Sequence, residues 1–357
     1  MNSSGSPDVE VHQWLLDQLS DEALTQCKQF ASESGLAGTH GTPEIIAALC
    51  NGFGHRGYLL EASRAGSTVG LLPLVYMKTL LFGKLLVSLP YLNWGGVVAS
   101  DQEVATKLVD QAIDLADALG VRFLELRHEG AIEHPKLKTV PSDKCQMRMP
   151  LTADSEDSWK RCRSTVRTQV RKGNKQGFEL AFGRHELIDA YYHVFSTNMR
   201  DLGTPVYSKK LFLAFLDDLG SRAELCVVRL RGEAIACALA FHHEYGITEI
   251  PSASALRAFR NTAVNTWMYW QLIQRAIERG ASTFDFGRST PGGPTFDFKR
   301  KWGATDTPVA WQCYAREGDS QQVRPENSKY NTAIRLWQKL PLWMANTAGP
   351  SIVRGIP

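Results

Sequence analysis

The sequence predicts an α/β protein built from two copies of one domain, each with its own mixed sheet. Its 357 residues exceed what one hydrophobic core usually serves, so two domains are expected. Its composition, 43% hydrophobic and 22% charged, is that of a globular protein and excludes disordered, collagen-like and coiled-coil chains. An internal repeat of strands and helices, with an offset of about 160 residues, indicates that the domain is duplicated.

The repeat is clearest where a helix leads into a strand. Apolar residues at three- and four-residue spacing predict the helices, and a glycine ends each of them. The predicted helix, glycine and strand lie at 102–119, Gly120 and 122–127, and again at 262–279, Gly280 and 283–286. Alignment on the two glycines places His128 opposite Arg288.

An antiparallel hairpin precedes the helix in each copy. The predicted strands are 58–63 with 68–76, and 224–230 with 233–242. Gly66 and Gly232 supply the positive φ that their tight turns require. We expect a first domain over residues 1–150, a second over 151–317 and a helical tail over 318–357.

Charge and cysteine usage limit the class of protein. Forty basic and 37 acidic residues nearly balance, which argues against a surface that is basic all over but allows a local basic patch. The seven scattered cysteines form no C-x-x-C pair, so a reducing cytoplasm is predicted. The first residues lack a secretory signal, and lysines and Pro90 interrupt the most apolar stretch, 70–92. A cytoplasmic protein follows, with peripheral membrane contact left open.

Residues 159–175 hold seven basic residues and no acidic one. On one helix they would form a basic stripe, Lys160, Arg163, Arg167, Arg171 and Lys175, beside an apolar stripe, Trp159, Cys162, Val166 and Val170. A solvated charged face is the simpler interpretation. Because like charges four residues apart repel each other, we favour a phosphate-bearing ligand held by Arg163, Arg167 and Arg171.

The motifs of nucleotide-binding and hydrolase sites are absent. No G-x-G-x-x-G follows a strand, there is no Walker loop and no G-x-S-x-G, and the nine histidines show no metal-ligand spacing, so no metal is predicted. The segment 284–304 instead combines glycines, three successive cations from Lys299, and the aromatic residues Phe298 and Trp302. A solvated loop explains the cations but not the aromatic residues among them.

This segment resembles a known family. Asp285 to Ser289 (DFGRS), the pair Phe298-Lys299, and Trp302-Gly303 resemble the hallmark of the FemAB-related branch of the GNAT acyltransferase superfamily. More specifically, the segment looks like that of the FemAB-like proteins associated with exosortase/PEP-CTERM gene clusters. The stretches 70–99, 124–128 and 327–357 fit the same family, so the resemblance covers nearly the whole chain.

The resemblance implies two tandem GNAT-like domains and an N-acyl or aminoacyl transferase. The acceptor would be an amine of a cell-envelope, peptidoglycan-related or exopolysaccharide component, and a lipid-linked one is among the alternatives. No bound cofactor is implied, and the co-substrate is either acyl-CoA or aminoacyl-tRNA. The chain departs from the family at 251–254, which lacks the W-A-S-S stretch, and at 257–263, where the pyrophosphate loop is not intact.

The resemblance places Lys299 at the reaction centre, and we expect this loop lysine to stabilise the developing oxyanion. Arg288 would position a phosphate or the acceptor, and Ser289, Phe298 and Trp302 would contact substrate. Glu249, expected at a strand end, would relay the proton of the amine, although a solvent-facing role is equally open. Asp285 is either catalytic or structural. The competing function is a catalytically inactive module that binds a nucleotide or a lipid-linked sugar.

The tail combines apolar residues and tryptophans with cations over 332–345. Such a segment suits a lipid headgroup layer on the cytoplasmic face of an inner membrane. The alternative is a terminal helix that docks its tryptophans onto the second domain. Pro341 and Pro350 favour this alternative because they interrupt a long amphipathic surface.

Overall fold

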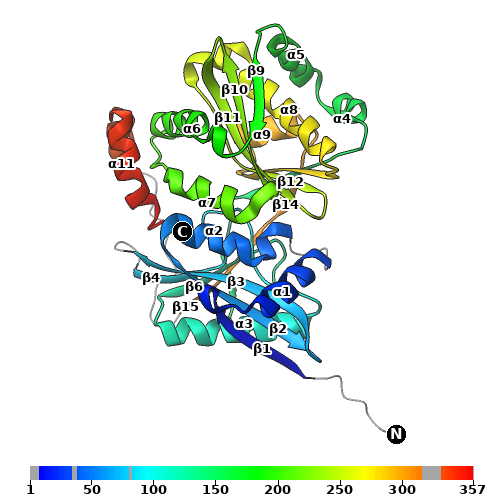
Figure 1. The fold of residues 1–357 in the computed structure, drawn as a ribbon, viewed down its shortest axis with the longest axis vertical. Helices are drawn as coiled ribbons and strands as arrows, with labels where there is room; N and C mark the ends of the chain where they lie inside the picture. Colours follow the sequence, from blue (N-terminus) through cyan, green and yellow to red (C-terminus); the bar gives the residue numbers. More distant parts are fainter. Residues whose placement is uncertain (1–7, 34–37, 80–82, 316–330, 357) are drawn as a thin grey trace. The chain divides into compact units, whose positions relative to one another are not determined.

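The computed structural model describes residues 8–33, 38–79, 83–315 and 331–356, which form two units (Figure 1). Within these ranges, unit 1 comprises 8–142 and 309–315, and unit 2 comprises 143–308 and 331–356. Each unit contains one mixed sheet with helices packed on it. The predicted α/β class with two mixed sheets is confirmed.

The sheet of unit 1 has the order β1-β2-β3-β4-β6-β15-β7, with β5 paired to β3. Only β4 and β6 pair in parallel among these strands. The strands are β1 (Val9–Leu15), β2 (Arg56–Arg64), β3 (Ser67–Thr79), β4 (Gly83–Val87), β5 (Val98–Ala99), β6 (Phe123–His128), β7 (Lys138–Thr139) and β15 (Ala310–Ala315). The helices are α1 (Asp21–Glu33), α2 (Pro43–Phe53) and α3 (Gln102–Leu119).

Helices cover both faces of this sheet. Leu60 and Leu72 pack in one core with Leu108 of α3. Gly57, which points to the opposite face by the alternation of β2, is in contact with α2, since an added Cβ would lie 2.7 Å from Ile46 Cγ2. The helix α3 has the predicted bounds, from the Asp101 cap to the left-handed Gly120.

The sheet of unit 2 has the order β14-β8-β13-β12-β11-β10-β9. Its one parallel pair among these strands is β12–β13. The strands are β8 (Cys145–Pro150), β9 (Glu179–Gly183), β10 (Ala223–Leu230), β11 (Glu233–His243), β12 (Ile247–Ala255), β13 (Thr283–Ser289) and β14 (Thr305–Pro308). The helices are α4 (Ser155–Arg161), α5 (Ser164–Gly173), α6 (Ile188–Leu202), α7 (Lys209–Leu219), α8 (Val264–Glu278), α9 (Pro294–Arg300), α10 (Asn331–Trp337) and α11 (Leu342–Val353).

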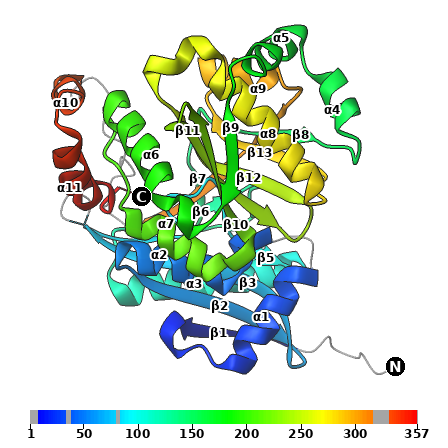
Figure 2. The ribbon, with the colours of Figure 1, turned by 45° about the horizontal axis from the view of Figure 1, so that its top comes forward.

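The helices α6 and α8 lie on opposite faces of this second sheet (Figure 2). Ala238 of β11 packs in the same core as Met268 of α8. The neighbouring Cys237 points the other way, and its Sγ donates a hydrogen bond of 3.4 Å to the carbonyl of Tyr191 in α6. The alternation of one strand thus fixes both helix layers.

The predicted repeat is present in both units as hairpin, strand, helix and strand. The hairpins β2–β3 and β10–β11 turn through Ala65-Gly66 and Arg231-Gly232, and both residues of each turn have positive φ. This conformation is the type I′ turn that joins twisted strands with two residues. The same strained turn at the same place supports the interpretation of the chain as a duplication.

The units divide the chain differently from the predicted ranges 1–150, 151–317 and 318–357. Residues 145–150 form β8, which pairs with β13 and β14 in the sheet of unit 2. Residues 310–315 form β15, which returns to pair with β6 and β7 in unit 1. The sequence around each strand resembles neither a linker nor a domain boundary. Each strand belongs to the unit in which it pairs, and its pairing partners lie far away along the chain.

The predicted docking of the tail through its tryptophans holds for Trp337, which is half-buried with its Nε1 shielded, but not for Trp343. Ala345, Gly349 and Val353 of α11 are its buried residues, and a Cβ on Gly349 would lie 2.8 Å from the Val206 backbone nitrogen. Trp343 remains 69% exposed. Among the residues that the structure describes, no helix combines the length and the apolar composition needed to cross a membrane.

Candidate active site at the carboxyl end of β13

The parallel contact between β12 and β13 is short. It joins three residue pairs, from Ile247–Thr283 to Glu249–Asp285, after which β13 continues beside β8 alone. The end of β13 then leads to α9. In open α/β sheets, ligands bind outside the carboxyl ends of parallel strands, where neighbouring strands separate.

An irregularity in β13 starts at Asp285. The register between β13 and β8 shifts between Asp285 and Arg288, where Gly287 has φ +72°. The fully buried Asp285 carboxylate accepts hydrogen bonds from the Gln146 side chain, from Arg148 Nε at 2.9 Å, and from the Gly287 backbone N–H at 2.7 Å. The carboxylate therefore fixes the bulge to two side chains of β8.

Lys299 lies on α9 rather than on a loop, and its side chain is buried, with only 7% of the residue exposed. Its Nζ donates to the Gly287 carbonyl at 3.0 Å and to the Arg288 carbonyl at 2.9 Å. Burial lowers the pKa of Lys299 from 10.5 to about 8, against the opposing effect of the Asp285 carboxylate. An ammonium group has three N–H donors, so two bonds to the backbone leave one for a substrate oxygen.

Two polar atoms beside this lysine have no hydrogen-bond partner in the described part of the chain. They are Gln146 Oε1 and Ser289 Oγ, both buried. Gln146 lies opposite Arg288, and Cys145 lies opposite Ser289, in the β8–β13 pair. Buried polar atoms are usually satisfied, so the two atoms are suited to receive a polar group of a bound molecule.

The aromatic residues expected to contact substrate form the support of α9. Trp302 is fully buried, and its ring lies 6.1 Å from that of Phe298 and 6.4 Å from that of Tyr269, measured between centroids. Phe298 is only partly buried and packs against the same core. Phe298 and Trp302 therefore anchor this end of α9 to the core, on either side of Lys299 in the sequence.

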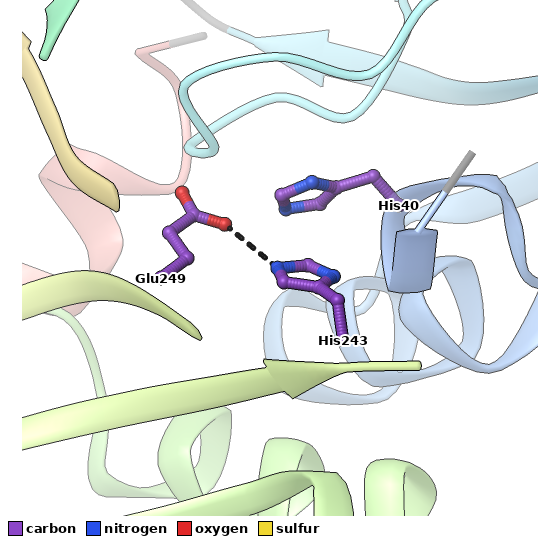
Figure 3. Close-up of side chains that lie close together, drawn as sticks. All are labelled: His40, His243 and Glu249. Carbon is purple, nitrogen blue, oxygen red and sulfur yellow. Dashed lines mark ion pairs between the residues drawn. The ribbon is translucent and has the colours of Figure 1, made fainter. Parts of the chain in front are cut away.

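Glu249 occupies a different environment from the one expected. It lies near the start of β12 rather than at a strand end, and it is fully buried rather than facing solvent. Its Oε2 lies 3.4 Å from Nε2 of His243, the last residue of β11 (Figure 3). The two side chains form a buried carboxylate–imidazole pair within unit 2.

The basic segment is two helices instead of the single predicted one. α4 ends at Arg161, and α5 begins at Ser164 after an extended Cys162 and Arg163. A tertiary bond accounts for the break, since the Arg163 backbone N–H donates to the Lys301 carbonyl at 2.9 Å. The basic stripe is therefore interrupted, whereas the apolar stripe docks as predicted, with Cys162, Val166 and Val170 buried and Trp159 packed against the same core.

The same bond places Arg163 beside the end of α9. Arg163, Arg300, Lys301 and Asp297 line an open hollow of about 290 Å³. Three cations face one carboxylate there, so the hollow attracts anions. Arg171 lies farther along α5, over the ring of Trp159, and Arg167 donates to the Lys160 carbonyl at 3.1 Å.

The structure thus brings together most of the predicted residues of unit 2. Asp285, Arg288, Ser289, Phe298, Lys299 and Trp302 converge where β13 meets α9. Gln146 and Arg148 are site residues that the sequence did not predict. No local signal marks them, because they reach the site only through pairing of β8 with a strand about 140 residues later.

Comparisons with known proteins show which domain family and which fold the chain resembles. Residues 160–300 match a family model described as acetyltransferase (GNAT) domain. No curated protein matches the chain. The fold is similar to the crystal structure of FemX, with TM-score 0.62 and 15% identity over 76% of this chain and 90% of that one.

Two further solved structures share the fold. The C-terminal domain of a putative lysylphosphatidylglycerol synthetase from Agrobacterium fabrum has TM-score 0.55 and 13% identity, over 82% of this chain and 92% of that one. A tandem GNAT protein from the clavulanic acid biosynthesis pathway has TM-score 0.54 and 10% identity, over 86% and 98%. Residues 160–300, which contain Lys299, therefore form an acetyltransferase (GNAT) domain within a tandem GNAT fold, and the protein is an acyltransferase.

Proposed function

We propose that the protein transfers an acyl or aminoacyl group from an activated, phosphate-bearing donor to the amine of a cell-envelope or polysaccharide-related acceptor. The observation that carries the proposal is Lys299, buried at the end of β13 with one N–H left for a substrate oxygen. It lies in the domain that matches the acetyltransferase model.

The reaction is aminolysis of an ester or thioester. The neutral amine attacks the carbonyl carbon, the new C–N bond forms, and the carbonyl oxygen becomes an oxyanion. Lys299 donates its remaining N–H to that oxygen, and the Gly287 and Arg288 carbonyls hold the ammonium group in place beforehand. The C–O or C–S bond then breaks, and the alcohol or thiol leaves with a proton.

We propose that Glu249 relays the proton that the amine loses. Its Oε2 lies 3.4 Å from Nε2 of His243. Because both side chains are fully buried, the proton reaches this pair through an intervening group. Asp285 acts as a positioning residue: its carboxylate holds the bulge that aims two carbonyls at Lys299. Ser289, next to Arg288, offers its hydroxyl to the substrate.

The donor phosphates bind in the hollow lined by Arg163, Arg300 and Lys301 and along α5 to Arg171. Residues Arg257–Thr262, in place of the GNAT pyrophosphate loop, form a 3-10 turn, and Ala263 has φ +65° before α8. This geometry differs from a glycine-rich anion loop, so side-chain cations carry the phosphate contact. Acyl-CoA and aminoacyl-tRNA both present such phosphates, and product analysis by mass spectrometry with each donor decides between them.

The acceptor amine is lipid-linked in our proposal, and the protein contacts the cytoplasmic face of the inner membrane through its tail. Leu336 and Trp343 are 63% and 69% exposed. Arg335, Lys339 and Arg354 accompany them, and residues 331–356 include no acidic residue. The solved structure with the related fold that is named for lysylphosphatidylglycerol synthesis makes a lipid acceptor a reasonable starting point.

Replacement of Lys299 by Met tests the assignment. We expect turnover to fall by about 10²- to 10³-fold, as for the loss of one oxyanion donor. Because Met also leaves two carbonyls without their donor, the free energy of unfolding should fall by about 1–3 kcal/mol, so chemical denaturation must verify that the variant is folded. Lys210→Met, which removes an exposed cation from α7, is the control and should keep full activity.

Full turnover in a folded Lys299→Met variant would show that Lys299 does not act at the reaction centre. A wild-type protein that transfers no acyl group from either donor, yet binds a nucleotide or a lipid-linked sugar, would favour the inactive binding module instead.

A further inference from the structure

The first unit contains a hollow of its own at the position that the repeat makes equivalent to the Lys299 site. β4 and β6 run parallel from Leu85–Phe123 to Val87–Glu125, as β12 and β13 do in unit 2. His128 ends β6, and the repeat aligns it with Arg288. A hollow of about 150 Å³ opens there, lined by residues of unit 1 that include Trp94, Gly95, Gly96 and His128.

The hydrogen bonds around His128 fix the tautomer of its ring. Gln312 Nε2 donates to the Ile132 carbonyl at 2.9 Å, and Gln312 Oε1 accepts from the Ile132 backbone N–H at 2.8 Å. The orientation of the amide is therefore determined by the backbone. Its Oε1 also lies 3.0 Å from His128 Nδ1, which must be the protonated nitrogen.

The other ring nitrogen is then a bare acceptor. His128 is 4% exposed, and its Nε2 has no hydrogen-bond partner among the residues that the structure describes. Burial lowers the pKa of His128 to about 4, despite the bond to Gln312, so the ring is neutral at pH 7. A buried lone pair of this kind is best satisfied by an O–H or N–H group.

The arginine that lines the hollow is already paired. Arg127 donates to Glu125 Oε1 from Nε at 2.9 Å and to the Leu92 carbonyl from Nη1 at 3.1 Å. Its guanidinium also lies 4.2 Å from the ring centroid of Trp311. The arginine thus braces the loop that follows β4, and it offers little attraction to a phosphate.

Two glycines allow the loop to lie against the imidazole. Gly95 has φ +147°, and its N–H donates to the Arg127 carbonyl at 3.0 Å. A Cβ on Gly96 would lie 2.1 Å from His128 Cδ2 and 2.8 Å from Nε2. A side chain at position 96 would therefore displace the ring, whereas a Cβ on Gly130, at the rim of the same hollow, would meet no atom within 4 Å.

We propose that this hollow is a second ligand site, in which His128 Nε2 accepts a hydrogen bond from a neutral hydroxyl or amide group, with a sugar ring as the class of ligand. The volume equals that of about five water molecules, which suits one small polar ring. Trp94, an aromatic side chain in the lining, favours a ring with apolar C–H faces over a linear ligand.

The test uses the full chain labelled with 15N and observes the histidine ring nitrogens by NMR. In the free protein we expect the His128 signals of an Nδ1–H tautomer with an unprotonated Nε2 at neutral pH. Glucose and N-acetylglucosamine are the probes, and inorganic phosphate is the charged comparison. Both sugars should shift the His128 signals in a saturable manner, while phosphate should not, and the signals of the exposed His12 should stay constant.

Gly96→Ala should abolish this response, and the matched variant Gly130→Ala should retain it. An Nε2–H tautomer in the wild-type protein, or no response of His128 to either sugar, would overturn the proposal even if Gly96→Ala failed to fold. A response to phosphate alone would overturn the ligand class, and an unchanged response in folded Gly96→Ala would overturn the location.

Discussion

At the scale of single residues, Lys299 has two properties that are hard to combine. Its side chain is buried, which disfavours the charged form, yet two carbonyls and the nearby Asp285 carboxylate favour that form. The balance leaves the pKa at about 8, close enough to neutrality for the amine to change its charge readily. At pH 7 the ammonium form dominates, and this form donates the third hydrogen bond.

The pH dependence of the reaction should reveal which form of Lys299 works. If the ammonium group stabilises the oxyanion, kcat/KM falls as the pH rises through about 8, because the cation is lost. Lys299→Arg keeps its charge and should move this decline to higher pH, whatever its effect on the maximal rate. A kcat/KM that increases through the same range would instead identify the neutral amine as a base.

The same shift affects stability, with a defined sign. The folded pKa of about 8 lies below the ordinary value of 10.5, so the unfolded chain binds more protons between these values. This one residue therefore makes the free energy of unfolding increase with pH across that window. Urea denaturation of the wild type and Lys299→Met at several alkaline pH values should show a smaller slope in the variant.

At the scale of the elements, the bulge in β13 shapes the backbone that holds Lys299. Asp285 anchors it through three donors, two of them on β8, and Gly287 supplies the left-handed residue. The Gly287 and Arg288 carbonyls of the bulge accept hydrogen bonds from Lys299 on α9. The motif DFGR thus describes a backbone shape as well as a set of side chains.

Asp285→Asn should disturb this shape and, through it, Lys299. The amide must present an N–H to one of three donors, which should lower the free energy of unfolding by about 1–3 kcal/mol. Loss of the carboxylate also removes an influence that raises the pKa of Lys299, so the alkaline decline of kcat/KM should shift to lower pH. Asp306→Asn, an exposed residue on β14, is the control. Loss of activity with unchanged stability and pH profile would indicate direct catalysis by Asp285.

The basic segment also depends on its elements. Arg163 lies between α4 and α5 with its backbone bonded to Lys301, and Arg171 lies two turns farther along α5. A ligand with several phosphates can contact both the hollow and the helix, whereas a small anion reaches only one of them.

Replacing Arg163, Arg167 and Arg171 by Ala should weaken binding of the phosphate-bearing donor and flatten its salt dependence. Arg163 and Arg171 are exposed and Arg167 is half-buried, so salt should screen their attraction for the phosphates. Titration calorimetry with CoA and with tRNA, at low and high salt, measures both effects, and Lys210→Ala serves as the control for the loss of a cation elsewhere. Equal affinities for the wild type and the triple variant at both salt concentrations would show that the basic segment is only a solvated charged face.

At the scale of the whole molecule, the duplicated fold distributes different chemistry between its copies. The position that carries Arg288 in unit 2 carries His128 in unit 1, with a neutral ring in place of a cation. The tail belongs to unit 2, where α11 contacts α6 while Leu336 and Trp343 stay exposed.

The tail should bind anionic membranes through these exposed residues. We expect the full chain to sediment with vesicles that contain phosphatidylglycerol, and Leu336→Ala with Trp343→Ala to reduce the bound fraction, with stability changed by no more than about 0.5 kcal/mol. Leu202→Ala, which removes another exposed leucine, is the matched control. A wild-type chain that stays in the supernatant would end the membrane proposal.

The sequence alone determined the elements whose signals are local. Helix α3 has the predicted bounds, and both hairpins form where predicted, because apolar periodicity, capping residues and turn glycines act over a few residues. The resemblance around Lys299 likewise identified a GNAT domain from residues that lie close together in the chain.

Only the tertiary structure decided how these elements combine. The break before Arg163 comes from a bond to Lys301, the assignment of β8 and β15 comes from distant strand pairing, and the burial of Lys299 comes from packing of α9 on β13. In each case the partner lies more than ten residues away along the chain. Local propensity contains no information on such contacts, because their free energy is realised only when the folded chain brings both groups together.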